Sequence, residues 1–311
     1  MKGSKVLHMM GTIIELTVIH EDAEQVLEDL VQHLIEYEHR FSANASDSEL
    51  MQINLQAGRQ AVRVHPELYR LIEFGKYASL VKDTPLNIAI GPLIQTWRIG
   101  FTDARLPSET EIREKCQLID PTNIHLNPDE QSVYLAKPGM KIDLGALAKG
   151  YITDLLVKRL VYWQVKSALL NLGGNVYVYG EQSAHLNGEW YVGIQNPFLA
   201  RHQNELVIRA KNESIVTSGI YERKLTVKGH TYHHIFDTHT GYPIETPIVS
   251  VSIVAPTSLL AEKWTTQSFL TDPYQALANI EQAPGIEGVI ILDNQVIHYS
   301  SGITQRIVNK S

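Results

Sequence analysis

Cysteine is nearly absent from this sequence, which contains Cys116 and no other cysteine among its 311 residues. A single thiol excludes a disulfide within the chain and a zinc site made of several cysteines. Long apolar runs are also missing, since no stretch approaches the ~20 apolar residues that a membrane-spanning helix needs. The first residues contain neither the apolar core of a signal peptide nor a cysteine for lipid attachment. We therefore expect a cytoplasmic protein as the sequence is written, although removal of an export leader would leave the same residues.

Positive charge is in short supply as well. The 27 lysines and arginines are outnumbered by 34 aspartates and glutamates, which gives a formal net charge of −7. A nucleic-acid-binding protein needs a basic face, so we expect no nucleic-acid partner. Hydrophobic residues make up 44% of the chain and charged residues 20%, a balance that allows an ordinary core. The sequence contains no internal repeat, low-complexity tract or long linker.

Two periodicities predict the secondary structure. Apolar residues at helical spacing predict helices over 21–40, 66–81, 259–269 and 274–280, and another that starts near 147. Segments rich in β-branched residues predict strands over 10–19, 133–135, 140–142, 167–180 (two strands joined by a double-glycine turn), 190–194, 206–210, 249–255, 288–292 and 296–299. We expect 133–135 and 140–142 to pair across Pro138 and Gly139.

The succession of many strands in hairpin-like order favours an α+β fold with mixed or antiparallel sheets over a doubly wound fold. We expect one domain over residues 1–311, with a polar, loop-rich excursion at about 100–131.

The segment 141–158 concentrates features of a ligand site. Asp143 follows an expected strand, small residues come next, and a helix begins with Lys149 in its first turn. A helix N-terminus presents free N–H groups and partial positive charge, which suits phosphate. The order Lys149-Gly150-Tyr151 does not match a Walker A loop. Alternatively, Asp143 is a helix N-cap and the small residues permit close packing.

Two further segments combine glycine with polar residues. The double glycine in Asn171–Asn175 either lets the backbone approach a ligand or forms a plain hairpin turn. The cluster 217–223 holds two hydroxyls, a glycine and Arg223. These side chains could bind a phosphate or a ribose. Alternatively, the cluster forms a solvated turn.

Histidine and oxygen ligands supply two more candidates. His233 and His234 would point to opposite faces of a strand, and one of them could act as a general base or be merely structural. Glu262 and Thr266 share one face of an expected helix. With a backbone carbonyl they could hold Mg²⁺, or they are a surface acid and a threonine bonded to its own helix.

In their order along the chain, these segments resemble the FAD:protein FMN transferase family, also called the ApbE family and formerly labelled thiamine biosynthesis lipoproteins. Each motif is short, but the resemblance spans nearly the whole chain. The matching residues are Met10-Gly11-Thr12, Arg40-Phe41-Ser42 with Ser48-Glu49-Leu50, Gly91-Pro92-Leu93 with Trp97, Asp143-Leu144-Gly145-Ala146 with Lys149-Gly150, Asn171-Leu172-Gly173-Gly174, Thr217-Ser218-Gly219 with Tyr221-Glu222-Arg223, and His234-Ile235 with Asp237 and Thr240-Gly241.

The resemblance implies a T-fold-like α+β core of two lobes with FAD in a cleft between them. It also implies Mg²⁺-dependent transfer of FMN from FAD to a Ser or Thr of a target flavoprotein, with release of AMP. The acceptor segment would have the pattern D-x-x-[ST]-G-A-[ST].

The resemblance also implies roles for individual residues. The expected catalytic residues are Lys149 and His234. The expected metal ligands are Glu262, Thr266 and the backbone carbonyl of Ala146. The expected FAD contacts are Met10, Asn87, Ala89, Asp143, Lys149, Gly173, Ser218, Gly219, His234 and Ile235.

Three features depart from the family pattern. Glu262 stands where the family usually has Asp, Asn175 stands where Asp often follows the double glycine, and the export signal of most members is missing. Two alternatives stay open, the first because it would use the same site and the second because Glu262 replaces the family's Asp. The same site could hydrolyse FAD to FMN and AMP with Mg²⁺, or the protein could bind FAD without catalysis.

Overall fold

The computed structural model describes residues 1–82 and 84–308. The chain forms two compact units. Unit 1 comprises Met1–Glu36, Lys149–Gly219 and Pro247–Ser311, and unit 2 comprises Tyr37–Ala148 and Ile220–Thr246. No helix among the described residues is long and apolar enough to span a membrane.

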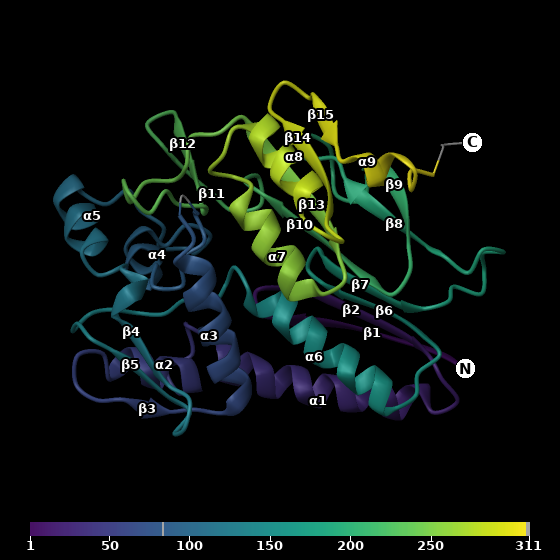
Figure 1. Cartoon of the computed structure of the whole chain (residues 1–311), viewed down its shortest axis with the longest axis horizontal. Helices are drawn as coiled ribbons and strands as arrows, with labels where there is room; N and C mark the ends of the chain where they lie inside the picture. The colour runs from purple at the N-terminus through teal and green to yellow at the C-terminus, as the bar shows by residue number, and fades with distance from the viewer. Residues whose placement is uncertain (83, 309–311) are drawn as a thin grey trace. The chain divides into compact units, whose positions relative to one another are not determined.

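Unit 1 is built on an eight-stranded sheet (Figure 1). Every neighbouring pair of strands is antiparallel. The strands follow one another across the sheet in chain order: β1 (Lys2–Met9), β2 (Thr12–Ile19), β6 (Ser167–Leu172), β7 (Asn175–Gly180), β10 (Glu213–Gly219), β13 (Ile248–Ala255), β14 (Glu287–Leu292) and β15 (Ile297–Tyr299).

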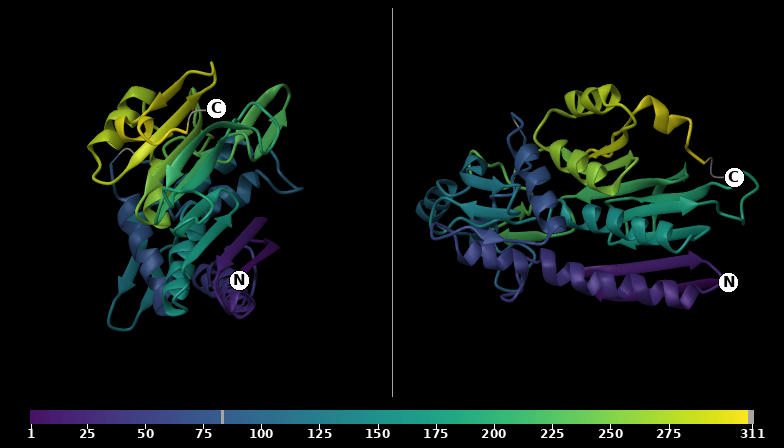
Figure 2. Two further views of the ribbon diagram at one scale, coloured as in Figure 1. Left: turned by 90° about the vertical axis from the view of Figure 1, so that its right-hand side faces the viewer. Right: turned by 60° about the horizontal axis from the view of Figure 1, so that its bottom comes forward.

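Helices cover one face of this sheet. Alternation in β2 buries Ile14, Leu16 and Val18 completely. The helices of the unit are α1 (Ala23–Phe41), which continues into unit 2, α6 (Ala148–Tyr162), α7 (Ser258–Gln267) and α8 (Pro273–Gln282). Figure 2 shows the start of α1 alongside the β1–β2 hairpin. The expected helices and most expected strands of this unit are confirmed.

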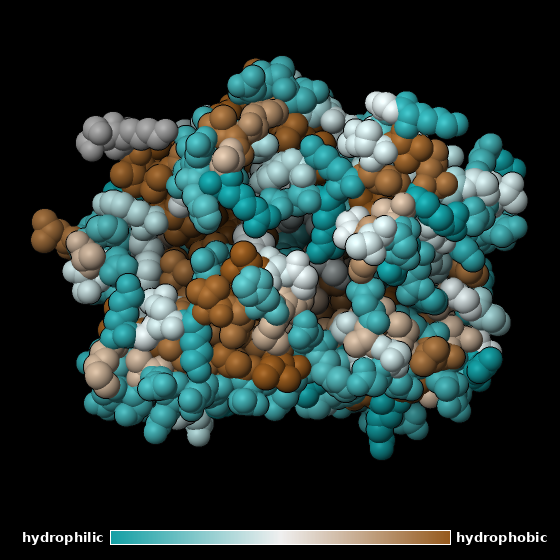
Figure 3. Space-filling view, turned by 180° about the vertical axis from the view of Figure 1, so that it is seen from behind, coloured by the Kyte–Doolittle hydropathy of each residue, from teal (hydrophilic) through white to brown (hydrophobic). Residues whose placement is uncertain are grey.

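The opposite face of the sheet is covered only in part. The hairpin of β8 (Trp190–Gln195) and β9 (Asn204–Ala210) packs there with α9 (Ser301–Thr304) in one apolar cluster with residues of β7, β10, β13 and β14. On β1 and β2, Val6 is 61% exposed and Ile13 41% exposed. Seen from behind, brown apolar side chains lie among teal polar ones (Figure 3).

Unit 2 contains short helices and small sheets. Its helices are α2 (Glu49–Leu55), α3 (Pro66–Ser79), α4 (Gly91–Trp97), α5 (Glu109–Cys116) and the 3₁₀ helix η1 (Pro121–Asn123). Its sheets are β3 (Val62–Arg63), β5 (Ser132–Leu135) and β4 (Ile124–Asn127) in that order, and β11 (Lys224–Val227) with β12 (His230–His233). The fully buried Trp97 lies against three aromatic rings and donates from Nε1 to Gly241 O at 3.1 Å.

The expected pairing of 133–135 with 140–142 is wrong. β5 pairs with β3 and β4, while Lys141 forms only an isolated parallel bridge with Ile90. The backbone of Ile142 is instead held by a side chain, because Asn54 both donates to Ile142 O at 2.9 Å and accepts from Ile142 N at 2.7 Å. A buried amide thus replaces a neighbouring strand. The α+β class with antiparallel sheets is confirmed.

Candidate functional site

Lys149 and Glu262 form an ion pair within unit 1. The helix expected near 147 begins at Ala148 as α6, so Lys149 lies in its first turn. Its Nζ lies 3.2 Å from Oε1 of Glu262, which belongs to α7 and is 3% exposed. A carboxylate removed from water in this way needs a positive partner or hydrogen bonds. The ammonium of Lys149, whose side chain is 31% exposed, supplies one.

The double glycine forms a hairpin turn that brings Asn175 to this pair. Gly173 and Gly174 have φ of +64° and +89°, a backbone region that favours glycine. A Cβ on Gly173 would also come within 2.0 Å of Thr12 Oγ1. Beyond the turn, the buried Asn175 donates from Nδ2 to Glu262 Oε1 at 3.0 Å. The turn is therefore structurally required, and contact of Gly173 with FAD stays a prediction.

The two helices that carry Lys149 and Glu262 are clamped together. A Cβ on Gly150 would lie 2.6 Å from Ser258 O, so α6 and α7 approach closely only because this residue is glycine. Asp154 accepts hydrogen bonds from the backbone N–H groups of Ser258, at 2.7 Å, and Leu259, at 3.0 Å. Burial raises the pKa of Asp154 to about 6, because these hydrogen bonds offset only part of the cost of desolvation. Sequence reasoning missed Asp154, since nothing separates it from a solvated acid on a helix.

The hydroxyl groups of α7 differ in their surroundings. Thr266 lies one turn after Glu262 and is half-buried. Thr265 is fully buried, donates to Glu262 O at 2.9 Å and accepts from Ser218 Oγ at 2.9 Å. Ser218, an expected FAD contact, therefore ties β10 to α7, and Gly219 ends that strand. Neither finding tests contact with FAD.

Asp143 lies in unit 2 at a turn rather than at the cap of α6. Its Oδ1 accepts from Gly145 N at 2.8 Å, and its own N–H donates to Ile88 O at 2.8 Å. Burial raises the pKa of Asp143, while the Gly145 hydrogen bond and the charge of Arg223 lower it. Ala146, in the same unit, is exposed.

The two neighbouring histidines do not both lie in a strand, so that expectation is wrong. β12 ends at the buried His233, whose Nε2 lies 2.8 Å from Ile244 O and whose Nδ1 accepts from Ile235 N at 3.2 Å. Both ring nitrogens are thus used, and burial lowers the pKa of His233. His233 is a structural, neutral histidine. His234 follows the strand and is half-buried, as is Ile235.

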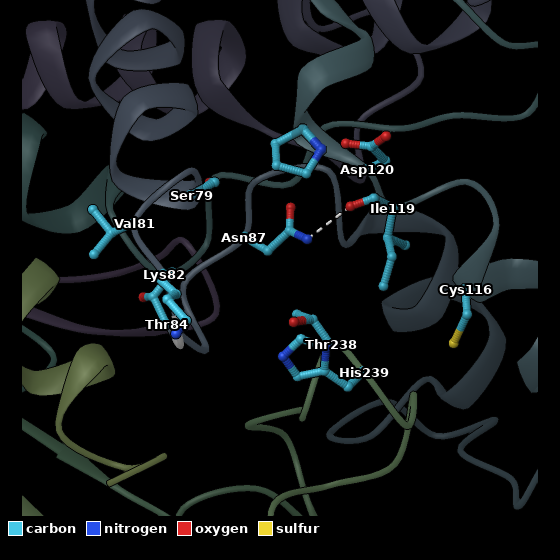
Figure 4. A pocket seen from close by; sticks show the side chains of 11 residues that line it. Ser79, Val81, Lys82, Thr84, Asn87, Cys116, Ile119, Asp120, Thr238 and His239 are labelled. Carbon is cyan, nitrogen blue, oxygen red and sulfur yellow. Dashed lines mark hydrogen bonds between the residues drawn. The ribbon is translucent and has the colours of Figure 1, made fainter.

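A pocket of about 540 Å³ lies in unit 2 near Asn87 (Figure 4). The amide of Asn87 donates to Ile119 O at 2.7 Å and accepts from Ala89 N at 2.8 Å, so both ends of this side chain hold the pocket wall. Ala89 itself is fully buried. The lining residues are Ser79, Val81, Lys82, Thr84, Asn87, Cys116, Ile119, Asp120, Pro121, Thr238 and His239.

Met10 occupies an unusual turn in unit 1. Met10 and Gly11 join β1 to β2 with φ of +54° and +68°, the pattern of a two-residue hairpin turn in which both central residues have positive φ. Asn or Gly usually fills the first position, and a long side chain with positive φ is uncommon. Contact of Met10 with FAD stays a prediction.

Among the described residues, no group of three or more His, Cys, Asp or Glu side chains is placed to hold a metal ion. The expected metal ligands include only one such side chain, Glu262. The others are a hydroxyl and a carbonyl, so this set of ligands stays a prediction. Hard oxygen donors of this kind suit Mg²⁺.

Comparisons with known proteins agree with the motifs. A model of the ApbE family matches residues 10–290. A FAD:protein FMN transferase of Klebsiella pneumoniae (strain 342) is 37% identical over 293 residues, which cover 94% of this chain and 90% of that protein. A FAD:protein FMN transferase of Treponema pallidum (strain Nichols) is 33% identical over 314 residues, which cover 96% of this chain and 87% of that protein. The crystal structure of an ApbE protein from Thermotoga maritima matches with a TM-score of 0.90 at 25% identity, over 99% of this chain and 100% of that one. The resemblance inferred from the motifs is thereby confirmed, and this chain belongs to the ApbE family.

Proposed function

We propose that this protein transfers the FMN moiety of FAD to a Ser or Thr hydroxyl of a target flavoprotein and releases AMP, in a reaction that requires Mg²⁺. Membership of the ApbE family and the names of its relatives support flavin transfer. The observation that carries the proposal is the ion pair of Lys149 with the buried Glu262, whose Oε1 also accepts from Asn175. It brings together an acid suited to a metal and a cation suited to phosphate.

Glu262, Thr266 and the carbonyl of Ala146 are the residues that would hold Mg²⁺. The first two fit that role because they are oxygen donors one turn apart on α7. Oε1 of Glu262 is engaged by Lys149 and Asn175. When bound, the metal would offset the negative charge that develops on the pyrophosphate.

Lys149 would bind a phosphate of FAD. Its position in the first turn of α6 adds a full positive charge to the partial positive charge of the helix end. Asp143, Met10, Asn87, Ala89, Gly173, Ser218, Gly219 and Ile235 complete the proposed FAD contacts. Because Asn87 also lines the pocket of about 540 Å³, we assign that pocket to one ring system of FAD.

His234 would act as the general base that takes the proton from the attacking hydroxyl. A serine or threonine hydroxyl is a weak nucleophile until its proton is removed. His233 cannot serve in this way, since its two nitrogens are used within the unit. The acceptor would be a protein segment of the pattern D-x-x-[ST]-G-A-[ST].

One experiment tests the proposal. The protein is incubated with FAD, Mg²⁺ and a flavoprotein domain that contains the acceptor segment, and the intact masses of both proteins are measured. We expect the acceptor to gain the mass of FMN less one water and AMP to appear. Appearance of FMN and AMP with an unchanged acceptor would show hydrolysis instead, and unchanged FAD that nevertheless binds to the protein would show binding without catalysis.

A further inference from the structure

Asn175 is a fully buried amide at the start of β7 whose polar atoms are all engaged by side chains. Nδ2 donates to Glu262 Oε1 at 3.0 Å. Oδ1 accepts from Thr153 Oγ1 at 2.9 Å and from Ser258 Oγ at 2.5 Å. Ser258 Oγ also lies 2.6 Å from Ser214 Oγ. The amide therefore joins α6, α7 and the sheet at one point.

The chemistry of these neighbours determines which way the amide faces. An ionised carboxylate only accepts hydrogen bonds, so Glu262 must face the NH₂ group of Asn175. The hydroxyls of Thr153 and Ser258 then meet the carbonyl oxygen, to which they can donate. A flipped amide would place its oxygen against the carboxylate of Glu262. Asn175 is consequently fixed as a neutral donor toward Glu262.

Lys149 and Asn175 hold the same oxygen of Glu262 but differ in freedom. Lys149 is a long, partly exposed side chain. In the proposed function it turns from Glu262 toward a phosphate of FAD when FAD binds. Asn175 is short, enclosed and anchored by two hydroxyls, so it stays in place. Once Lys149 leaves, Asn175 is the described side chain that still fixes the direction of the carboxylate.

We propose that Asn175 is a positioning residue, which orients Glu262 toward a metal ion and does so without adding a second negative charge. The inference rests on the proposed function, because it assumes that Glu262 binds metal. An acid at position 175 would face Glu262 at about the same 3.0 Å that now separates Nδ2 from Oε1. Two like charges at that distance repel strongly in a buried site.

The first test asks whether residue 175 must donate a hydrogen bond to Glu262. It measures the stability of the full chain against urea, without metal or FAD. We expect Asn175→Asp to raise the unfolding equilibrium constant in urea at least tenfold at pH 8. Asn196→Asp is the matched control, since Asn196 also donates to a carboxylate, that of Glu205, in a half-buried place. The control should change the constant much less. The double variant Asn175→Asp with Glu262→Gln exchanges donor and acceptor, and it should recover most of the loss.

The second test reads metal binding directly. Free Mn²⁺ is measured by electron paramagnetic resonance with FAD present and no acceptor protein. Asn175→Ala should bind Mn²⁺ about 10–100-fold more weakly than the parent, as expected when a partner of a metal ligand is removed. A residue needed only for folding would lower stability and leave the Mn²⁺ affinity of the folded protein unchanged.

Parent affinity for Mn²⁺ in folded Asn175→Ala would overturn the positioning role. Failure of the exchange variant to recover stability would overturn the amide-to-carboxylate assignment. If the parent itself binds no Mn²⁺, the metal part of the proposed function fails and the positioning role fails with it. The parent titration thus separates the two failures.

Discussion

The ammonium of Lys149 lies 3.2 Å from Oε1 of Glu262, so the acid assigned to the metal is paired with the cation assigned to the phosphates. Glu262 is costly to bury without a positive partner, and Lys149 supplies one before any ligand arrives. Their association also means that a change at either residue alters both binding and stability. The two effects must be measured separately in every variant.

We expect Glu262→Gln to lower Mg²⁺-dependent FMN transfer by about 100-fold or more, because it removes the charge that would hold the metal. The amide oxygen of glutamine can still accept from Lys149 and Asn175, so circular dichroism should show an intact fold. The measurement is the initial rate of acceptor labelling by mass spectrometry. Glu15→Gln is the control, since Glu15 is an exposed carboxylate that accepts from Asn171. Full activity in Glu262→Gln would contradict the metal assignment.

Lys149→Met should weaken FAD binding at least tenfold. A charge-assisted hydrogen bond contributes about 1.5–3 kcal/mol, and methionine keeps the length of the side chain while removing its charge. Isothermal titration calorimetry with FAD gives the affinity. Lys158→Met is the matched control on the exposed side of the same helix and should leave the affinity unchanged. An unaltered affinity in Lys149→Met would mean that Lys149 only neutralises Glu262.

Asp143→Ala should also weaken FAD binding about tenfold or more, through loss of a contact to the dinucleotide. The same calorimetric titration measures it, and circular dichroism checks the fold, since Asp143 also stabilises its own turn by accepting from Gly145. Asp129→Ala, at an exposed acid of the same unit, is the control. If both variants bind FAD as the parent does, Asp143 has a structural role alone.

Asp154 should make stability depend on pH. Its pKa is about 6 in the folded protein, against 3.8 for the ordinary side chain. The folded state therefore binds a proton that the unfolded state has released between these values, so stability falls as pH rises from about 4 to about 6. The difference corresponds to at most about 3 kcal/mol.

Urea unfolding across this pH range, compared with Asp154→Asn, measures the effect. Asparagine does not titrate, so the parent should lose stability relative to the variant between pH 4 and pH 6 and run parallel to it above that range. Parallel behaviour throughout would show that the Asp154 pKa is not raised by burial.

Periodicity was enough to predict most of the fold. Glu15 and Thr17 separate the apolar residues Ile14, Leu16 and Val18, and β13 consists mostly of Ile and Val, so both strands are plain in the sequence. β1 was missed because Lys2, Ser4 and Lys5 interrupt its apolar residues, as suits a strand at the edge of a sheet. The predicted pairing of 140–142 with 133–135 was wrong because the apolar residue Ile142 looks like part of a strand in the sequence. Its backbone is bonded instead to a side chain, that of Asn54.

The candidate site was predictable only in its parts. Motifs located Lys149, Asn175 and Glu262 separately, and the family pattern even marked Asn175 and Glu262 as departures. The hydrogen bond between Asn175 and Glu262 joins residues 87 positions apart, and no local pattern in the sequence encodes such a pairing. Asp154 shows the same limit, since its hydrogen bonds reach the backbone of Ser258, 104 positions later.

The sheet of unit 1 can be assembled in the order of synthesis on the ribosome, because its strands follow one another in chain order from β1 to β15. When a strand is synthesised, the strand next to it in the sheet already exists. The segments of unit 2 are insertions between parts of unit 1, and the entropic cost of bringing the ends of an insertion together grows only slowly with its length. The polar groups around Asn175 must nevertheless wait for α7. A nascent chain that has not reached Glu262 contains Thr153 and Asn175 without the carboxylate to which Asn175 donates, so α7 must be synthesised before this part of unit 1 can close.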